Sequence, residues 1–451
     1  MKNTAYLLLA FIVILLGLSA CGGNGNDGSV PTRYQPTPAP PRLQGALAHP
    51  VPTPTPTPEP TGTPILGFFP DDREYVEIEL WHILSGTRRM YLMELIYAFH
   101  DAQPYVRIYD MYHGNHDYLR HNTQVADAAG ILPHISQASI VDMTRYRNAR
   151  MLLSLAPFMD DPNVGLSNQC INDILPVFHN NLTVGGQWFA APFFMGVRTL
   201  FYNAEALRDN NISPPETWEE VEGIAAARLG IGVTDALDWE WASLLRLYGG
   251  AYITEAANRA DFASYEGIDA LILLADLMNG GNVRLATPEC FARGEVALLF
   301  ACSGDVVEIK EAVGDNFPLS AVPVPSFEDQ RAAELTGDVL VLFENVRHST
   351  NERVGAWEFL RFTFDTENAA NWAVNTGFLP QRASIFYTET PIQYAIYASL
   401  PHAFVRTLHP QAHSVRALLL EEFAQIPYTE ESPEVILTRA ELRANDLLAG
   451  R

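Results

Sequence analysis

Seven tryptophans give this 451-residue chain flat apolar faces that could stack on the C–H faces of a sugar or polyol. Five of them fall near predicted strand ends or loops: Trp81, Trp188, Trp239, Trp241 and Trp372. The other two, Trp218 and Trp357, lie on predicted amphipathic helices, and we expect them to pack in the core. Residues 235–240, around Trp239, show no helical register and are expected to form an acidic loop.

Arg416 is a candidate anion-binding residue. Its guanidinium could form two parallel hydrogen bonds to a phosphate or carboxylate, which are stronger than bonds between neutral groups. The alternative is a surface ion pair with Glu421 or Glu422, which would contribute little.

A cluster of histidines leaves a metal-binding receptor open as an alternative. Three imidazoles and two carboxylates occur in one short segment: Asp110, His113, His116, Asp117 and His121. Three imidazoles can bind zinc if they converge. We expect no metal and no cofactor, because His113 and His116 fall in a predicted loop between a strand and a helix.

Motifs of common enzyme classes are absent from the sequence. It contains no Gly-x-Ser-x-Gly turn, no His-Glu-x-x-His helix and no phosphate-binding glycine loop. A secreted carbohydrate-active enzyme needs only a pair of carboxylates, so the 53 acidic residues leave that alternative open. We expect a protein without enzymatic activity. The net charge of −24 argues against nucleic acid as a partner.

The first residues predict export and a lipid anchor. Lys2 precedes an apolar run over residues 6–16, and small residues then lead to Cys21. This pattern is typical of a secretory signal, and Leu18-Ser19-Ala20-Cys21 resembles a lipobox, in which bacteria attach lipid to the cysteine. The apolar run is shorter than the ~20 residues that a membrane span needs. We therefore expect an extracytoplasmic protein that is tethered to the cell membrane through Cys21.

Residues 22–72 form a predicted Pro/Thr-rich linker, extended as polyproline II or simply disordered. About 380 residues follow, enough for two lobes. Cysteine is scarce after Cys21, with three residues left. Cys290 and Cys302 could form a disulfide, but buried free thiols, Cys170 included, are the favoured interpretation.

Strand and helix patterns alternate along this region. Strands are predicted at 75–80, from 106, at 199–202, 296–300 and 339–343. Helices are predicted from residue 92 to before Pro104, over about 117–129, after the N-cap Thr217, and over 354–364. The alternation indicates an α/β fold with mostly parallel sheets, which bind ligands beyond the carboxyl ends of their strands.

Several stretches resemble, in order, the family 1 extracellular solute-binding proteins of bacterial ABC importers. They include Leu155-Ala156-Pro157-Phe158, Gly186-Gln187-Trp188, Phe201-Tyr202-Asn203, Pro215-Glu216-Thr217-Trp218-Glu219-Glu220 and Thr376-Gly377-Phe378-Leu379-Pro380. The resemblance implies a two-lobe periplasmic-binding-protein fold, type II-like, with a hinge between lobes that are each a mostly parallel sheet flanked by helices. It places the N-terminal lobe at 73–192 and 322–377, and the C-terminal lobe at 193–321 and 378–451. It also implies a monomer whose partners are a small solute and the ABC permease.

Within the family the chain looks most like the glycerol-3-phosphate-binding branch. The stretch Tyr112-His113-Gly114-Asn115-His116 resembles that branch's "Y-K-G-N-Y", and Ala301-Cys302-Ser303-Gly304 its "A-S-S-G". By position, Ser303, Gly337 and Arg416 match its ligand contacts. The full set of ligand-binding residues that we expect is Trp81, His82, His116, Gln137, Met195, Trp239, Ser303, Gly337, Phe378 and Arg416.

Other positions depart from that branch. Its tyrosines appear here as His116 and Phe378, a glutamate that contacts hydroxyls falls at Ile140, and a ligand-binding serine falls at Met195 or Gly196. Sites built on hydrogen bonds discriminate sharply, so these losses change ligand recognition. We expect a carbohydrate, polyol or glycerol-phosphate-like solute, with glycerol 3-phosphate itself bound weakly or not at all.

Overall fold

The computed structural model of the protein describes residues 75–254, 256, 258–386 and 389–450. These residues belong to one compact unit, Gly62–Arg451. Cys21, the predicted signal and the predicted linker lie outside the described residues. Within the described part of the chain, no helix is both long enough and apolar enough to cross a membrane.

Ten strands of the described chain join in one sheet, in the order β10-β7-β11-β6-β13-β3-β1-β2, with β12 beside β6 and β14 beside β13. Their bounds are β1 Val76–His82, β2 Val106–Tyr112, β3 Ile135–Ser139, β6 Ala191–Asn203, β7 Ile231–Val233, β10 Val283–Leu285, β11 Leu298–Cys302, β12 Leu319–Val322, β13 Ala333–Leu342 and β14 Ala403–Phe404. Two small hairpins pair β4 (Thr183–Val184) with β5 (Gln187–Trp188) and β8 (Ile253–Thr254) with β9 (Arg259–Ala260).

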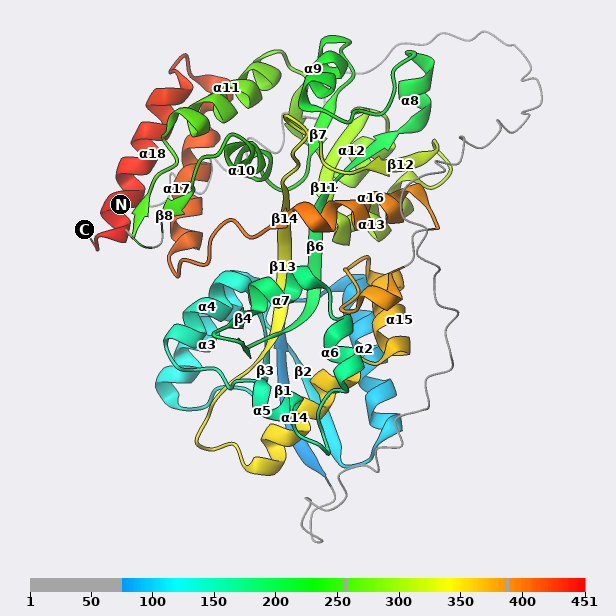
Figure 1. Ribbon diagram of the computed structural model, residues 1–451, viewed down its shortest axis with the longest axis vertical. Helices are drawn as coiled ribbons and strands as arrows, with labels where there is room; N and C mark the ends of the chain where they lie inside the picture. The colour runs from blue at the N-terminus through cyan, green and yellow to red at the C-terminus, as the bar shows by residue number, and fades with distance from the viewer. Residues whose placement is uncertain (1–74, 255, 257, 387–388, 451) are drawn as a thin grey trace, which may run out of the picture. The chain divides into compact units, whose positions relative to one another are not determined.

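The two ends of this sheet are parallel, as predicted, and its middle is antiparallel. β1 runs parallel to β2 and β3 at one end, and β7 runs parallel to β10 and β11 at the other. Between these ends, the long strands β6 and β13 pair antiparallel with each other and with their outer neighbours. Figure 1 shows β6 and β13 side by side, linking the two helix-covered ends of this α/β fold.

Helices cover both ends of the sheet. Those beside β1–β3 are α2 (Gly86–Ala102), α3 (His116–Ala129), α4 (Ile140–Asn148), α5 (Ala156–Met159), α6 (Asn168–Asp173), α7 (Pro176–Leu182), α14 (Thr350–Thr363) and α15 (Thr366–Thr376). Those towards β7 and β10–β12 are α8 (Ala204–Asp209), α9 (Trp218–Ala226), α10 (Asp238–Leu247), α11 (Tyr265–Asn279), α12 (Pro288–Ala292), α13 (Val306–Val313), α16 (Pro391–Ser399), α17 (Ala412–Phe423) and α18 (Pro433–Leu448). Short 3-10 turns lie at Ser303–Asp305 (η2), Ala383–Ile385 (η3), Leu400–His402 (η4) and Ile426–Tyr428 (η5).

Local sequence accounts for where these elements begin. Along β1, Val76, Ile78 and Leu80 alternate inward, so a strand buries one apolar face. Helix α9 begins after Thr217, whose side chain accepts from the Glu220 N–H while the Glu220 side chain accepts from the Thr217 N–H. This reciprocal pair satisfies two N–H groups that the first helical turn leaves free, and the predicted N-cap is confirmed.

The core contains most of the tryptophans. Trp218 and Trp357 are buried, as predicted. Trp188, Trp241 and Trp372 are buried too, so these three do not offer the ring faces for sugar stacking that the sequence allowed. The Trp241 indole N–H donates to the carbonyl of Gly267, and that of Trp372 donates to the carbonyl of Phe193. These two buried rings satisfy their own polar groups, which is why they pack as core residues.

Residues 238–247 also correct the prediction of a loop around Trp239, because they form α10. The helix buries Trp241, Leu244 and Leu245 on one side and carries acids in its first turn. Burial of this short apolar face, rather than a long periodic pattern, stabilises the helix. Cys170, Cys290 and Cys302 are free thiols, as favoured, but only Cys170 is buried and the other two are partly buried.

Candidate functional site

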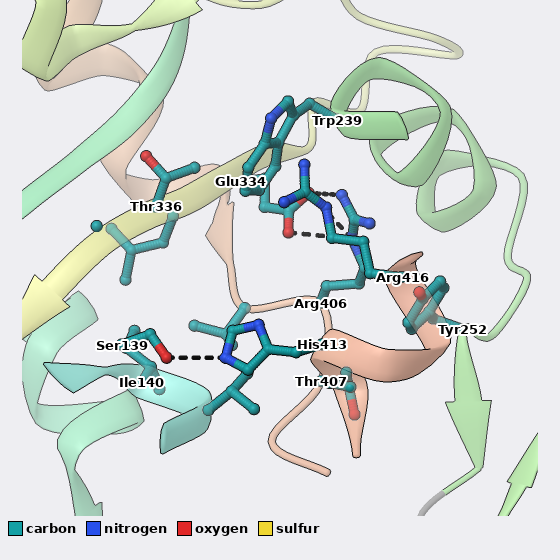
Figure 2. Close-up of a pocket in the computed structure, with 15 residues that line it drawn as sticks. Ser139, Ile140, Trp239, Tyr252, Glu334, Thr336, Arg406, Thr407, His413 and Arg416 are labelled. Carbon is teal, nitrogen blue, oxygen red and sulfur yellow. Dashed lines mark hydrogen bonds and ion pairs between the residues drawn. The ribbon is translucent and has the colours of Figure 1, made fainter. Parts of the chain in front are cut away.

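A pocket of about 130 Å³ lies between segments that are distant in sequence, and we name it the Trp239 pocket. Its lining comes from residues 139–141, Trp239, Tyr252, residues 334–337 of β13, residues 405–407 and the start of α17 (Figure 2). One water needs roughly 10–15 Å³ by this kind of measure, so the pocket holds on the order of ten waters. That space fits a solute with the size of a small sugar or a polyol derivative.

A group of four charged side chains forms one wall of the pocket. Glu334, Arg406 and Arg416 line the pocket, and the buried Asp238, which does not line it, pairs with both arginines. Arg416 pairs with Asp238 through two parallel bonds, Nε to Oδ2 at 2.7 Å and Nη2 to Oδ1 at 2.9 Å. Arg406 lies between two carboxylates, with Nη1 2.5 Å from Oδ2 of Asp238 and Nη2 2.8 Å from Oε2 of Glu334. Asp238, Glu334 and Arg406 are buried, whereas the side chain of Arg416 is 31% exposed. The alternative of a surface pair between Arg416 and Glu421 or Glu422 is wrong, because Arg443 pairs with Glu421 and Arg439 with Glu422.

Burial and neighbouring charges shift the pKa values of Asp238 and Glu334 in opposite directions. Burial raises the pKa of the Glu334 carboxyl to about 7, although Arg406 opposes the shift. Burial also acts to raise the pKa of Asp238, but Arg406 and Arg416 together lower it to about 2. Asp238 is therefore ionised at neutral pH, while the pKa of Glu334 lies close to neutrality.

Trp239 stands above this wall as its aromatic face. The guanidinium carbon of Arg416 lies 4.3 Å from the ring centroid, and that of Arg406 lies 5.1 Å away. Arg198 approaches the ring at 6.0 Å and is itself paired with Glu240 at 2.7 Å. These cation–π contacts fix the ring beside the pocket. The indole nitrogen is buried without a hydrogen-bond partner among the described residues.

His413 connects α17 to the start of α4 on the opposite side of the pocket (Figure 2). Its Nε2 lies 3.1 Å from the Ser139 hydroxyl and 3.4 Å from Asp142. Asp142 is buried and also accepts from Nε of Arg120 at 3.0 Å. Burial acts to raise the pKa of Asp142, but His413 and Arg120 lower it to about 2. The pocket is therefore closed on this side by a polar contact.

Three of the ten expected ligand-binding residues line the Trp239 pocket, namely Trp239, Gly337 and Arg416. Ile140 lines it as well, at the position where the glycerol-3-phosphate-binding branch has a glutamate. His116 and Gln137 meet each other at Asp338, the next residue after Gly337. Their Nε2 atoms lie 2.8 Å and 2.6 Å from Oδ2 of Asp338. Asp338 raises the pKa of His116 against the effect of burial.

The other five expected residues lie outside the lining of this pocket. At the end of β1, Trp81 packs on His113 with ring centroids 4.2 Å apart, and the buried His82 lies 3.3 Å from Asp110. Met195 is buried within β6, and the buried Ser303 hydroxyl accepts from the N–H of Val197. Phe378 lines a separate hollow with Lys310 and Phe386.

Sequence reasoning missed Asp238, Glu334, Arg406 and His413 as site residues. Asp238 and Glu334 are two acids among 53, and nothing in their local pattern marks them as buried. Glu334 shares β13 with Thr336 and Asp338, so it does not stand out as a single polar residue in an apolar strand. Arg406 lies outside the helices and strands and His413 is the second residue of α17, and only the fold reveals their partners.

The histidines of the metal-binding alternative engage other partners. The Nδ1 atom of His113 lies 2.8 Å from Nδ2 of Asn122, and His116 contacts Asp338. Among the residues that the structure describes between 75 and 450, no group of three His, Cys, Asp or Glu side chains is placed to hold a metal ion.

A further cluster joins α2 to the turn before α13. The Nη2 atom of Arg88 lies 2.9 Å from the carbonyl oxygen of Gly304, 3.1 Å from the carboxylate of Asp305 and 3.0 Å from that of Glu308. The same guanidinium lies 5.0 Å from the ring centroid of Phe378. We name this group the Arg88 cluster. It links two elements that pack on opposite ends of the sheet (Figure 1).

Known proteins resemble this chain over most of its length. The sn-glycerol-3-phosphate-binding periplasmic protein UgpB of Yersinia pestis is 22% identical over 366 residues, 76% of this chain and 82% of that protein. The protein of the same name from Salmonella paratyphi A is 23% identical over 415 residues, 82% of this chain and 92% of its own.

Solved structures show the same fold. The cyclic alpha-maltosyl-1,6-maltose binding protein of Arthrobacter globiformis has a TM-score of 0.70 at 22% identity, covering 84% of this chain and 100% of its own. UgpB of Mycobacterium tuberculosis, solved in complex with glycerophosphocholine, has a TM-score of 0.70 at 19% identity, covering 83% and 99%. The predicted two-lobe binding-protein fold is therefore confirmed.

A sequence model of a protein family provides the assignment. It describes bacterial extracellular solute-binding proteins and matches residues 113–399, well over half of the chain. The predicted family and the predicted location outside the cytoplasm are confirmed. The chain belongs to the bacterial extracellular solute-binding proteins.

Proposed function

We propose that this protein captures a carbohydrate, polyol or glycerol-phosphate-like solute in the Trp239 pocket and delivers it to an ABC permease. With the lobes at 73–192 and 322–377, and at 193–321 and 378–451, the pocket lies between them. Ser139–Val141 then belong to one lobe, and Trp239, Arg406 and Arg416 to the other. This double lining is the observation that carries the proposal.

The chemistry of the lining supports a polyhydroxylated ligand. Trp239 offers a ring face, and the surrounding side chains offer hydrogen-bonding groups. The names of the similar proteins specify glycerol 3-phosphate, glycerophosphocholine and a cyclic maltose derivative, all of which carry several hydroxyls or ester oxygens. We include their ligand classes in the proposal on this basis.

Closure of the lobes provides the mechanism. A solute that touches both linings binds the closed arrangement better than the open one and shifts the population towards closure. The closed form then docks on the permease as the loaded receptor. No chemical step on the solute is needed.

The pocket carboxylates also support binding rather than catalysis. A glycosidase needs one carboxyl group to act as an acid and a second to act as a base or nucleophile. Here Asp238 and Glu334 both pair with arginines. Because Arg406 and Arg416 pair with Asp238 and keep it ionised, this carboxylate is not free to act as an acid or a nucleophile. We therefore propose that the protein is not an enzyme.

We further propose that diacylglycerol on Cys21 anchors the protein and that residues 22–72 act as its tether. The lipobox-like residues before Cys21 support this proposal. Replacing Cys21 with serine should abolish lipidation and leave unprocessed precursor. Acylated Cys21→Ser protein in the membrane fraction would contradict it.

The function can be tested in two steps. A thermal-shift screen with sugars, polyols and their phosphates should find a stabilising solute, because a ligand of the native state raises stability by mass action. Calorimetry then compares the wild type with Trp239→Ala and Trp81→Ala. Loss of a stacking ring should weaken binding by about tenfold in Trp239→Ala.

The Trp81→Ala variant is the matched control, because Trp81 is a half-buried tryptophan outside the lining of the pocket. We expect its affinity to match the wild type. Weakened binding in Trp81→Ala together with normal binding in Trp239→Ala would move the site to the end of β1 and refute the proposal.

A further inference from the structure

We propose that Asp238 is a built-in counter-ion that makes the Trp239 pocket select neutral polyhydroxylated solutes over phosphate esters. Removal of this single carboxylate should convert the pocket into an anion-binding site. The inference rests on the proposed function in one respect, since it takes the Trp239 pocket as the solute site.

Asp238 occupies the donor edge of Arg416 that would otherwise bind an anion. A phosphate recognised by arginine accepts two parallel N–H bonds from one edge of the guanidinium. In Arg416 that edge, Nε and Nη2, already donates to both carboxylate oxygens of Asp238, at 2.7 and 2.9 Å. Arg406 directs Nη1 to the same carboxylate and Nη2 to the backbone carbonyl of Asp238. Both arginines of the pocket are thus bound to one residue.

Charge neutrality follows from the same contacts. Asp238 and Glu334 supply two negative charges when both are ionised, and Arg406 and Arg416 supply two positive charges. Behind Trp239, Arg198 and Glu240 form a second neutral pair. Across the pocket, His413 faces Ser139 and Asp142, and Asp142 is further paired with Arg120. Above about pH 7, where Glu334 is ionised, none of these groups gives the pocket an uncompensated positive charge with which to attract a phosphate.

Asp238 is also fixed in place. Its side chain is fully buried and accepts from three guanidinium nitrogens. It is the first residue of α10, where the N-terminal end of the helix favours a negative charge. Displacement of the carboxylate by an incoming phosphate would therefore cost free energy, and a phosphate that binds beside the carboxylate is repelled by its negative charge.

The pocket groups that are not engaged in ion pairs are suited to bind a ligand with hydroxyl groups. The Trp239 ring offers a face for C–H stacking, and Nη1 of Arg416 makes no hydrogen bond within the described part of the chain. Arg416 is the partly exposed member of the charged wall, so this nitrogen is placed to donate to a hydroxyl oxygen. A site with a ring face, single donors and no free charge fits a neutral sugar or polyol.

Calorimetry with inorganic phosphate and glycerol 3-phosphate at about pH 8, where Glu334 is ionised, tests this inference, and neither probe requires the natural solute to be identified. Asp238→Asn keeps the size of the side chain and removes its charge. We expect the wild type to show no binding at millimolar phosphate, and Asp238→Asn to bind glycerol 3-phosphate at least about tenfold more tightly than the wild type. Addition of Arg416→Ala to Asp238→Asn should abolish the gain.

Asp235→Asn is the matched control, because Asp235 is exposed and lies three residues away, whereas the carboxylate partners of Arg406 and Arg416 are Asp238 and Glu334. It changes the net charge of the protein by the same amount, and we expect no gain in anion binding. An equal gain in both variants would overturn the inference, because a general charge effect would then explain it. Near-ultraviolet circular dichroism checks that Asp238→Asn is folded.

The wild type provides a second criterion that does not depend on any variant. Salt-sensitive binding of glycerol 3-phosphate or phosphate at micromolar concentration would overturn the inference, while leaving the proposed receptor function intact. The proposed function fails separately, if Trp239→Ala retains full affinity for the solute found by the thermal-shift screen.

Discussion

Glu334 and Asp238 lie on the same wall of the pocket, but they respond differently to pH. Asp238 pairs with two arginines and keeps its charge, whereas burial raises the pKa of Glu334 to about 7. Between pH ~4.5 and ~7 the native protein therefore holds a proton on Glu334 that the unfolded chain has released. The native state loses this advantage as the pH rises, so Glu334 lowers the free energy of unfolding towards neutral pH.

We therefore predict that Glu334→Gln gains stability relative to the wild type as the pH rises. The difference in free energy of unfolding should grow by on the order of 2 kcal/mol between about pH 5 and about pH 8. Urea denaturation of both proteins across this range measures it. The exposed Glu219→Gln serves as the control and should show a constant difference. A constant difference for Glu334→Gln as well would show that Glu334 is ionised throughout.

Residue types predicted part of this site. Trp239 was singled out by its acidic stretch and Arg416 by the resemblance to the glycerol-3-phosphate-binding branch. The two do lie together, with ring centroid and guanidinium carbon 4.3 Å apart. Their acidic partners were not predictable, because pairing of Asp238 with Arg416 spans 178 positions in the sequence. Burial decides which of many acids matters, and burial is a property of the fold.

Among the elements, β13 has the largest role in placing the site. It pairs with both β3 and β6, and it contributes Glu334, Thr336 and Gly337 to the pocket. Gly337 has a φ of +108°, and a Cβ atom at this position would overlap the carbonyl oxygen of Phe194 on β6. The close approach of the two strands therefore requires a residue without a side chain.

We predict that Gly337→Ala destabilises the protein by about 2 to 4 kcal/mol, since it adds a backbone clash to an unfavourable φ. Gly249→Ala is the matched control, because Gly249 has a φ of +90° and open space around its Cβ position. Its cost should stay at about 1 to 2 kcal/mol. The midpoints and slopes of urea denaturation separate the two. Equal costs would mean that the strands can move apart.

The elements were predictable where sequence patterns are local. Alternation of Val76, Ile78 and Leu80 predicted β1, and Thr217 with Glu220 predicted the start of α9. The antiparallel centre of the sheet was not predictable, because pairing of β6 with β13 joins residues more than a hundred positions apart. Helix α10 was also missed, since tertiary burial of Trp241 and not its own periodicity stabilises it.

At the scale of the whole molecule, contacts between the proposed lobes decide how readily the lobes open and close. His413 with Ser139 and Asp142, and the Arg88 cluster with Asp305 and Glu308, both join residues that the proposed boundaries assign to different lobes. Such contacts exist only while the lobes are together. Opening and closing must break and remake them, so a bound solute has to add enough contacts to favour the closed form.

The central claim is that a solute binds between two lobes and closes them, and small-angle X-ray scattering tests it most directly. The radius of gyration should fall when the solute found by the thermal-shift screen is added to saturation. Trp239→Ala, measured at the same solute concentration, should remain close to its ligand-free value. An unchanged radius of gyration in the wild type, with binding demonstrated by calorimetry in the same sample, would contradict the account.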